Sequence, residues 1–99
     1  MQFVQQDGVW LLVDGPDPNH RRVIATLRDE IEVLALSEFC KLTLSAPDRI
    51  PEHFPVIHKG TAYTVTPLGS PGEKLALVIR GDGHSSTVAT EFAMPQAEH

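Results

Sequence analysis

The segment KLALVIR at residues 74–80, followed by GDG at residues 81–83, decides the fold class of this chain. Its leucines and isoleucine fall on alternate positions, the period of two that is typical of a β-strand with one buried face. The glycines and the aspartate after it are the residues of a tight hairpin turn. Residues 87–92 then have the pattern of a returning strand, so this part of the chain predicts an antiparallel β-hairpin.

Two further strands are expected from apolar runs that lie between turn residues. Residues 9–13, VWLLV, lie between Gly8 and a proline-bearing loop at residues 14–19. A continuous apolar run of this length is typical of a central strand buried on both faces. Residues 56–67 predict another strand, with a bend at Gly60.

The segment between these strands contains two more alternating stretches. Residues 22–28 predict a strand with one buried face, although Ile24 interrupts the alternation. Residues 31–35 alternate again, and Asp29-Glu30 is a short polar break between the two stretches. The simplest interpretation is a hairpin that joins two strands at this break.

One short helix is expected near the middle of the chain. Ser37 is a good N-cap, because its side-chain oxygen can accept a free amide of the first turn, and Glu38 suits the positive end of the helix dipole. The helix would run to about Ala46, where Pro47 ends it. The alternative is a strand at residues 41–44.

These elements predict an α+β, mostly β fold. The expected architecture is a single antiparallel meander sheet or a half-open barrel of six to seven short strands, with one short helix near the middle. Residues 1–93 would form one β-rich domain, and residues 94–99 would form a flexible C-terminal tail.

Composition limits the function classes. The chain has 99 residues and a net charge of -5, and acidic proteins repel phosphate backbones, so nucleic-acid binding is disfavoured. No apolar run approaches the roughly 18–20 residues that span a bilayer. Cys40 is the single cysteine, which excludes an internal disulfide and fits a reducing cytosol. We therefore expect a soluble cytoplasmic protein of bacterial origin, without a membrane partner or a cofactor.

Four basic residues are the candidate partner- or anion-binding residues. His20, Arg21 and Arg22 are consecutive at the junction of a loop and a strand, and Arg28 lies on that strand. Guanidinium groups bind carboxylates and phosphates through paired hydrogen bonds. These side chains could therefore bind an acidic partner or a single strand of nucleic acid.

His53 and His58 are weak candidates for a metal site. Histidine and carboxylate side chains are common metal ligands, and Glu52 is adjacent to His53. No third histidine or cysteine lies at the spacing of a metal motif. We predict no catalytic residue: residues 81–86 combine glycines with His and Ser but lack the pattern of a phosphate loop or a nucleophile elbow, and Cys40 is expected to be a buried apolar residue.

The stretch from Trp10 to Leu44 resembles a family of small uncharacterised cyanobacterial proteins. The shared features are a Trp in the first long strand, a Pro-bearing loop, two strands, and a helix that carries Glu38-Phe39-Cys40 and Leu42. The resemblance implies a sheet like that of single-stranded nucleic-acid-binding transcriptional regulators. It covers about a third of the chain, lacks the family's long helix and transfers no site residues.

These observations favour a small non-enzymatic protein-interaction or adaptor domain that self-associates as a homodimer. One helix cannot cover both faces of a sheet, while residues 9–13 are apolar on both faces, so either the sheet curls or another chain covers it. The alternatives are an accessory single-stranded nucleic-acid-binding domain that uses Arg21, Arg22 and Arg28, and a small metal-dependent protein that uses His53 and His58. The sequence does not identify the pathway.

Overall fold

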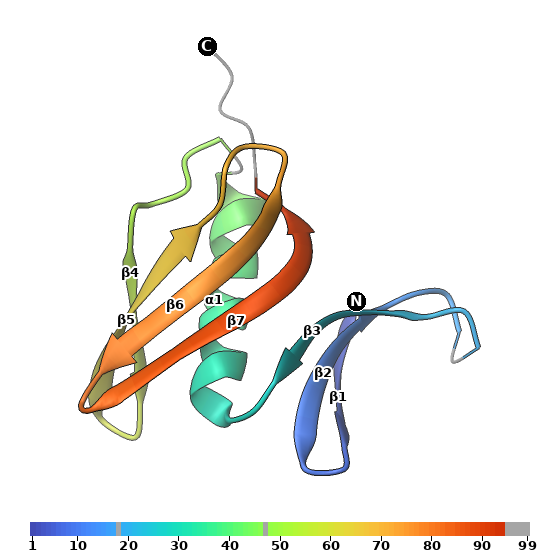
Figure 1. Ribbon diagram of the computed structural model, residues 1–99, viewed down its shortest axis with the longest axis horizontal. Helices are drawn as coiled ribbons and strands as arrows, with labels where there is room; N and C mark the ends of the chain where they lie inside the picture. Colours follow the sequence, from blue (N-terminus) through green and yellow to red (C-terminus); the bar gives the residue numbers. More distant parts are fainter. Residues whose placement is uncertain (18, 47, 95–99) are drawn as a thin grey trace.

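The structure is a computed structural model that describes residues 1–17, 19–46 and 48–94. Seven strands form one antiparallel sheet with the order β1-β2-β3-β7-β6-β5-β4, and one helix crosses it (Figure 1). The elements are β1 (Gln2–Gln6), β2 (Val9–Asp14), β3 (Arg22–Leu27), α1 (Glu30–Ser45), β4 (Phe54–His58), β5 (Thr61–Leu68), β6 (Lys74–Gly81) and β7 (His84–Ala93). The predicted α+β, mostly β class is confirmed, and the sheet is open because β1 and β4 are its two edges.

The sheet consists of two meanders. Strands β4 to β7 form the larger one, and α1 lies against one of its faces (Figure 1). Strands β1 to β3 form a second unit that extends to one side and is called the arm below (Figure 1). The arm joins the larger meander at one register position, Ala25 of β3 opposite Thr90 of β7.

Two-residue turns close the β1–β2, β4–β5 and β6–β7 hairpins. Asp82 and Gly83 have φ angles of 48° and 73°, and positive φ at both central residues is the geometry of a type I′ turn, which matches the twist of the flanking strands. This confirms the predicted hairpin at residues 81–83. Lys59 and Gly60 form a turn of the same kind, with φ of 50° and 80°, so the single bent strand predicted at residues 56–67 is instead the hairpin of β4 and β5.

The hairpin predicted at Asp29-Glu30 is wrong, because the helix begins there. Asp29 is the N-cap of α1, and its carboxylate accepts the backbone N–H of Glu32 at 2.9 Å. The Glu32 carboxylate in turn accepts the backbone N–H of Arg28 at 2.9 Å. This reciprocal arrangement is a variant of the capping box, in which the acidic residue at the third helical position satisfies a free donor before the helix.

Residues 31–45 are therefore helical throughout. Ser37 lies in the second turn of α1 and is not its cap, and the alternative strand at residues 41–44 is also wrong. Ala46 is the C-cap, and its N–H donates to the Leu42 carbonyl at 2.9 Å. Pro47, which was predicted to end the helix, lies outside the described residues.

Tertiary packing decides between helix and strand for residues 31–35. The alternation of Ile31, Val33 and Ala35 suggests a strand, but Ile31 and Ala35 are also four residues apart, and Leu36 and Phe39 continue the same helical stripe. Ala35 and Leu36 are fully buried, and Phe39 is almost so. The helix buries Ala35, Leu36 and Phe39 and packs Ile31 and Val33 against the core, whereas a strand would leave half of these residues on the other face.

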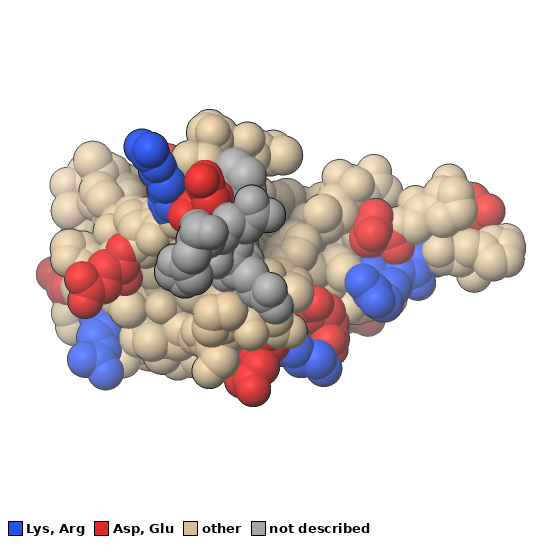
Figure 2. Space-filling view, turned by 90° about the horizontal axis from the view of Figure 1, so that it is seen from above, with Lys and Arg blue, Asp and Glu red and all other residues tan. Residues whose placement is uncertain are grey.

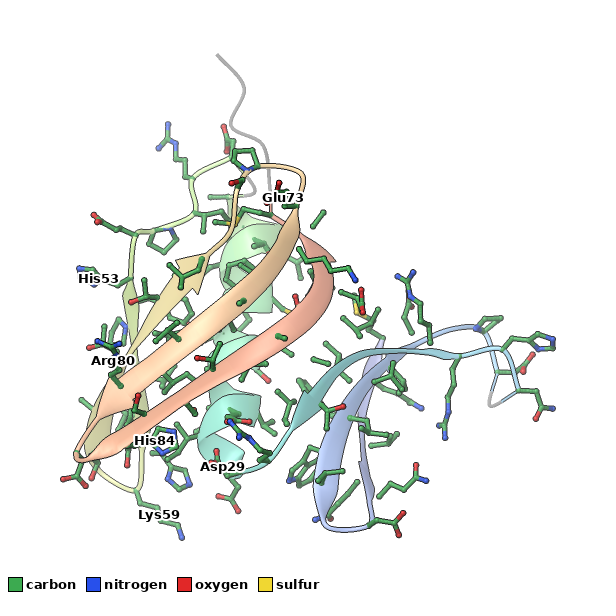
Figure 3. The ribbon with its side chains drawn as sticks, in the orientation of Figure 1. Asp29, His53, Lys59, Glu73, Arg80 and His84 are labelled. Atoms are coloured by element: carbon green, nitrogen blue, oxygen red, sulfur yellow. The ribbon has the colours of Figure 1, made fainter. Side chains whose placement is uncertain are left out.

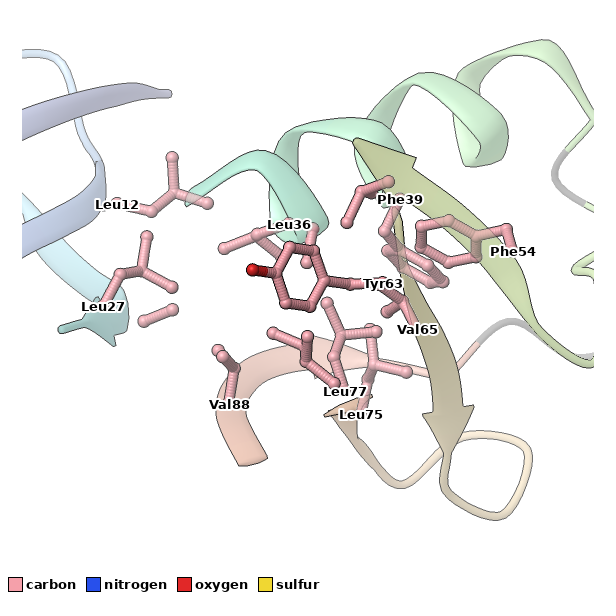
Figure 4. Packing of buried hydrophobic residues seen from close by; sticks show 14 of the residues in the cluster. Leu12, Leu27, Leu36, Phe39, Phe54, Tyr63, Val65, Leu75, Leu77 and Val88 are labelled. Carbon is pink, nitrogen blue, oxygen red and sulfur yellow. The ribbon is translucent and has the colours of Figure 1, made fainter. Parts of the chain in front are cut away.

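The core lies between α1 and the inner face of the sheet (Figure 4). Its largest fully buried apolar side chains come from α1 and from strands β3, β5, β6 and β7, namely Leu27, Leu36, Val65, Leu75, Leu77, Ile79 and Val88. The molecule measures 38 × 36 × 20 Å. A thickness of about 20 Å accommodates one sheet and one helix layer, since packed layers are about 10 Å apart.

The strand around Trp10 is not central. β2 lies between β1 and β3, second from the sheet edge. Leu12 and Val13 are buried, while Trp10 and Leu11 are half-buried, so the expected burial on both faces is only partly present. The register between β2 and β3 shifts so that Ala25 opposes Leu12 and Val23 opposes Val13.

That register shift explains the broken alternation of β3. Ile24 is the extra residue of a β-bulge, which places its side chain and that of Ala25 both in the core.

The corrected helix start gives a direct prediction. Asp29→Ala should lower the free energy of unfolding by about 1 kcal/mol, because it removes the N-cap. Asp29→Asn should retain most of the stability that the cap contributes, because Asn is also a good N-cap. Ser37→Ala is the matched control and should change stability by less than about 0.5 kcal/mol, because Ala is a good residue inside a helix. Urea denaturation followed by circular dichroism measures both. A larger loss in Ser37→Ala than in Asp29→Ala would contradict the assigned helix start.

Candidate interaction surface

The face of β4–β7 opposite α1 is covered by no other element of the described residues and is called the open face below (Figure 1). Side chains alternate along each strand, so residues between the buried core positions point to this face. They are mainly Thr, Ala and other small or apolar residues: Ile57, Ala62, Thr64, Thr66, Leu68, Ala76, Val78, Thr87 and Ala89. Leu68 is 49% exposed and Ile57 68% exposed.

The open face is hollowed over β5 and β6. A depression of about 310 Å³ is lined by Thr64, Thr66, Leu68, Val78 and Arg80. Thr66 opposes Val78 and Thr64 opposes Arg80 across the two strands. The threonine and valine side chains therefore lie beside one cationic group, the guanidinium of Arg80. Arg80 lies near the end of β6 that leads into the β6–β7 turn (Figure 3).

Arg80 differs from the other charged residues of this face. Lys74 forms an ion pair with Glu91, with Nζ and Oε2 2.8 Å apart. This pairing lowers the pKa of the Glu91 carboxyl, through the hydrogen bond and the charge of Lys74, with a smaller contribution from the charge of Arg22. Among the described residues Arg80 has no ion-pair partner, so its guanidinium is available to a carboxylate of another molecule.

A wider groove separates the arm from the larger meander. Its volume is about 560 Å³, and it follows the line where β3 and β7 diverge. Thr26 of β3 and Arg28, which follows β3, line it on one side, and Thr87 and Ala89 line it from β7. The groove therefore continues the open face toward the arm.

The basic residues predicted to bind a partner or anion do not form one site. His20 Nδ1 lies 2.9 Å from the Asp17 carboxylate, and Arg22 lies close enough to Glu91 to affect its pKa. Arg21 lines a separate cavity of about 240 Å³ together with Asp17. Basic and acidic residues are interspersed on the face shown in Figure 2.

Arg28 is separated from the other three basic residues by the length of β3, roughly 20 Å at 3.3 Å per residue. Its guanidinium donates to the Glu32 carboxylate at 3.0 Å, and that contact raises the pKa of Arg28. Because Glu32 is only 1% exposed, Arg28 mainly compensates a buried charge at the helix start.

The two histidines considered as metal ligands lie at opposite ends of β4. His53 precedes the strand and is exposed (Figure 3), whereas His58 ends it. His58 Nε2 is 2.8 Å from the Glu30 carboxylate on α1, and this contact lowers the pKa of Glu30. The described residues contain no group of three His, Cys, Asp or Glu side chains suited to hold a metal ion.

Two side chains that could act as nucleophiles, Ser86 and Cys40, lie against other packed side chains. Ser86 and His84 are neighbours on one face of β7, with Oγ and Nε2 2.9 Å apart. The His84 ring packs edge-on against Tyr63, with the ring centroids 5.7 Å apart. Cys40 is half-buried beside Phe92, and burial raises the pKa of its thiol, which disfavours the reactive thiolate.

Neither the open face nor the Glu30–His58 contact was predicted from the sequence. The alternation in β5 and β6 already assigns Thr64, Thr66 and Val78 to the face away from the core. Only the packing of α1 shows that no element among the described residues covers this face. Glu30 and His58 are 28 residues apart, and the error in the helix start hid their proximity.

The Glu30–His58 contact gives a prediction for the pH dependence of stability. The pKa of Glu30 is lowered below its ordinary value of about 4.5 in the folded protein. Glu30 therefore stabilises the fold above that value, and this stabilisation disappears as the pH falls through the lowered folded pKa. Glu30→Gln should reduce stability at pH 5.5 and have little effect at pH 2.5.

The control for this prediction is the same change in a His58→Gln background, where the effect of Glu30→Gln at pH 5.5 should shrink. Urea midpoints at both pH values measure the difference. An effect of Glu30→Gln that is equal at both pH values would show that its charge does not stabilise the fold.

No described helix combines the length and apolar character needed to cross a membrane. Comparisons with protein-family models, with curated proteins and with solved structures find no match for this chain. The resemblance of residues 10–44 to a cyanobacterial family therefore receives no support from them.

Proposed function

We propose that this chain is a small non-enzymatic interaction domain that binds a protein partner through the open face. The observation that carries the proposal is the absence of any described element over that face, although the opposite face is covered by α1. A sheet face with exposed Ile57 and Leu68 and half-buried Val78 leaves apolar area in water. Patches of this kind, rimmed by polar residues, mark protein interaction sites.

The chemistry of the open face specifies the kind of partner. Threonine and alanine side chains lose little side-chain entropy on contact, and Arg is among the residues that dominate binding energy in protein interfaces. A fitting partner presents small apolar side chains and one carboxylate that reaches Arg80. Desolvation by the surrounding apolar contacts would strengthen that ion pair.

The surroundings of the nucleophiles support the non-enzymatic part of the proposal. His84 and Ser86 are adjacent, but a base that activates serine is normally oriented by a third group, and the ring of His84 instead packs on Tyr63. The Cys40 thiol has a raised pKa. These contacts favour packing roles for all three residues.

The proposal is tested by a photo-crosslinking residue placed at Thr87 of the open face, in the cells that express the protein. Lys41 on the exposed side of α1 is the control position. A defined adduct should form from position 87 and not from position 41. The partner is then identified by mass spectrometry, purified and titrated against the domain.

In that titration Arg80→Glu should raise the Kd at least about tenfold, because it places a like charge opposite the partner's carboxylate. Lys41→Glu should change the Kd less than about twofold. Equal adducts from positions 87 and 41, or an unchanged Kd in Arg80→Glu, would overturn the proposal.

The distribution of charge also predicts how the chain treats nucleic acid. Several of its cations lie beside carboxylates and the net charge is -5, so single-stranded DNA or RNA should not be retained even at low salt. Fluorescence anisotropy with a labelled oligonucleotide measures this. Retention that weakens with salt and is lost in the Arg21→Ala/Arg22→Ala double variant would favour nucleic-acid binding instead.

A further inference from the structure

β1 is an unprotected sheet edge. Among the described strands it pairs only with β2, and it ends the strand order on the arm side. Its sequence, QFVQQ, contains neither a charged residue nor a proline. Natural sheet edges usually carry charged side chains, prolines or bulges that prevent another strand from adding to them.

The hairpin geometry identifies which backbone groups of β1 are free. The turn at Asp7-Gly8 has two residues, so the flanking pair, Gln6 with Val9, is hydrogen-bonded. Hydrogen-bonded and non-hydrogen-bonded pairs alternate along an antiparallel ladder. The N–H and C=O groups of Phe3 and Gln5 therefore point away from β2, toward the outside of the sheet.

The other edge of the sheet is protected. The turn at Lys59-Gly60 also has two residues, and His58 pairs with Thr61. The same alternation directs the backbone groups of Pro55 and Ile57 outward. Pro55 has no backbone N–H. A sheet tolerates proline at such an outward-facing edge position, and the missing donor blocks the addition of another strand. β1 lacks any equivalent residue.

We propose that β1 pairs antiparallel with β1 of a second copy of this chain, about a two-fold axis at Val4. This register opposes all five residues of the strand: Gln2 faces Gln6 of the second copy, and Val4 faces Val4. Phe3 faces Gln5, and both have their backbone groups free, so each such pair exchanges two hydrogen bonds. A symmetric pair of this kind satisfies every outward group of both strands.

The side chains favour a second copy as the occupant. The two Val4 side chains meet at a non-hydrogen-bonded position, where opposed residues approach most closely. On the inner face, Phe3 and Trp10 are half-buried and pack at the margin of the core. Phe3 of the second copy lies beside Gln5, which opposes Trp10, so both aromatic side chains gain cover.

The symmetry also bears on the open face. The two-fold axis of an antiparallel strand pair is perpendicular to the sheet, so both open faces lie on the same side of the dimer. This consequence, unlike the pairing itself, rests on the proposed function. Two linked faces would bind a partner with repeated sites more tightly than one face alone.

Sedimentation velocity over a range from about 10 µM to 1 mM tests the pairing, because a five-residue strand contact buries little area and favours a weak dimer. The mass should rise from 10.9 kDa toward twice that value. Amide exchange by NMR gives the register: the amides of Phe3 and Gln5 should become protected as concentration rises. The amide of Val4, already bonded to β2, should not change.

Gln5→Pro places at this edge the residue that protects β4, and it removes only an outward N–H, so the monomer should fold. Gln5→Thr is the matched control that keeps the N–H. Loss of the dimer in Gln5→Pro and its retention in Gln5→Thr would support the proposal. A dimer unaffected by Gln5→Pro, or a chain that stays monomeric at 1 mM, would overturn it. Neither result alters the cross-linking expected from position 87, which tests the open face separately.

Discussion

The junction between β3 and α1 fixes where the helix that covers the sheet begins. Asp29 caps the helix, and Glu32, although buried, accepts the backbone N–H and the guanidinium of Arg28. Loss of the Arg28 guanidinium would be costly, because the Glu32 carboxylate is shielded from water and would then also lack its counterion. The last residue before the helix and its first turn are therefore fixed to each other, and this sets the direction in which α1 leaves the sheet.

That direction determines which surfaces are covered. α1 has 16 residues and is about 24 Å long. It runs from the end of β3 across the larger meander to the chain that leads into β4, with its buried residues against the core of β5, β6 and β7. A single helix of this length covers one face of the meander. No other helix of the described residues covers the opposite face or the outer part of the arm.

The open face and β1 differ in the chemical groups that they present to another molecule. The open face presents side chains, with threonine and alanine around Arg80, and suits a partner that contributes area and a counter-charge. β1 presents backbone groups, which any strand can satisfy, and its near-symmetric sequence around Val4 favours an identical strand. The first is the surface proposed to bind another protein, and the second is the edge proposed to pair with a second copy of the chain.

Much of the fold was predictable from local patterns. The alternation in residues 74–80 and the turn at residues 81–83 predicted the β6–β7 hairpin, because side-chain direction in a strand and positive φ at a turn are local properties. The interruption at Ile24 was visible in the sequence and corresponds to the β-bulge. The prediction was wrong for residues 29–36. Ile31, Val33 and Ala35 fit the strand period as well as the helix period, and Asp29 was not recognised as the helix N-cap.

The sequence by itself determined the mostly β class, the hairpin at residues 81–83 and the assignment of inward and outward residues in β6 and β7, since these depend on spacing along the chain. Only the tertiary structure decided where α1 begins, which sheet face it covers, and that His53 and His58 lie at opposite ends of β4. It also decided that the strand of Trp10 lies near an edge. Burial and pairing across long sequence separations control these features, and the residues involved are not neighbours until the chain has folded.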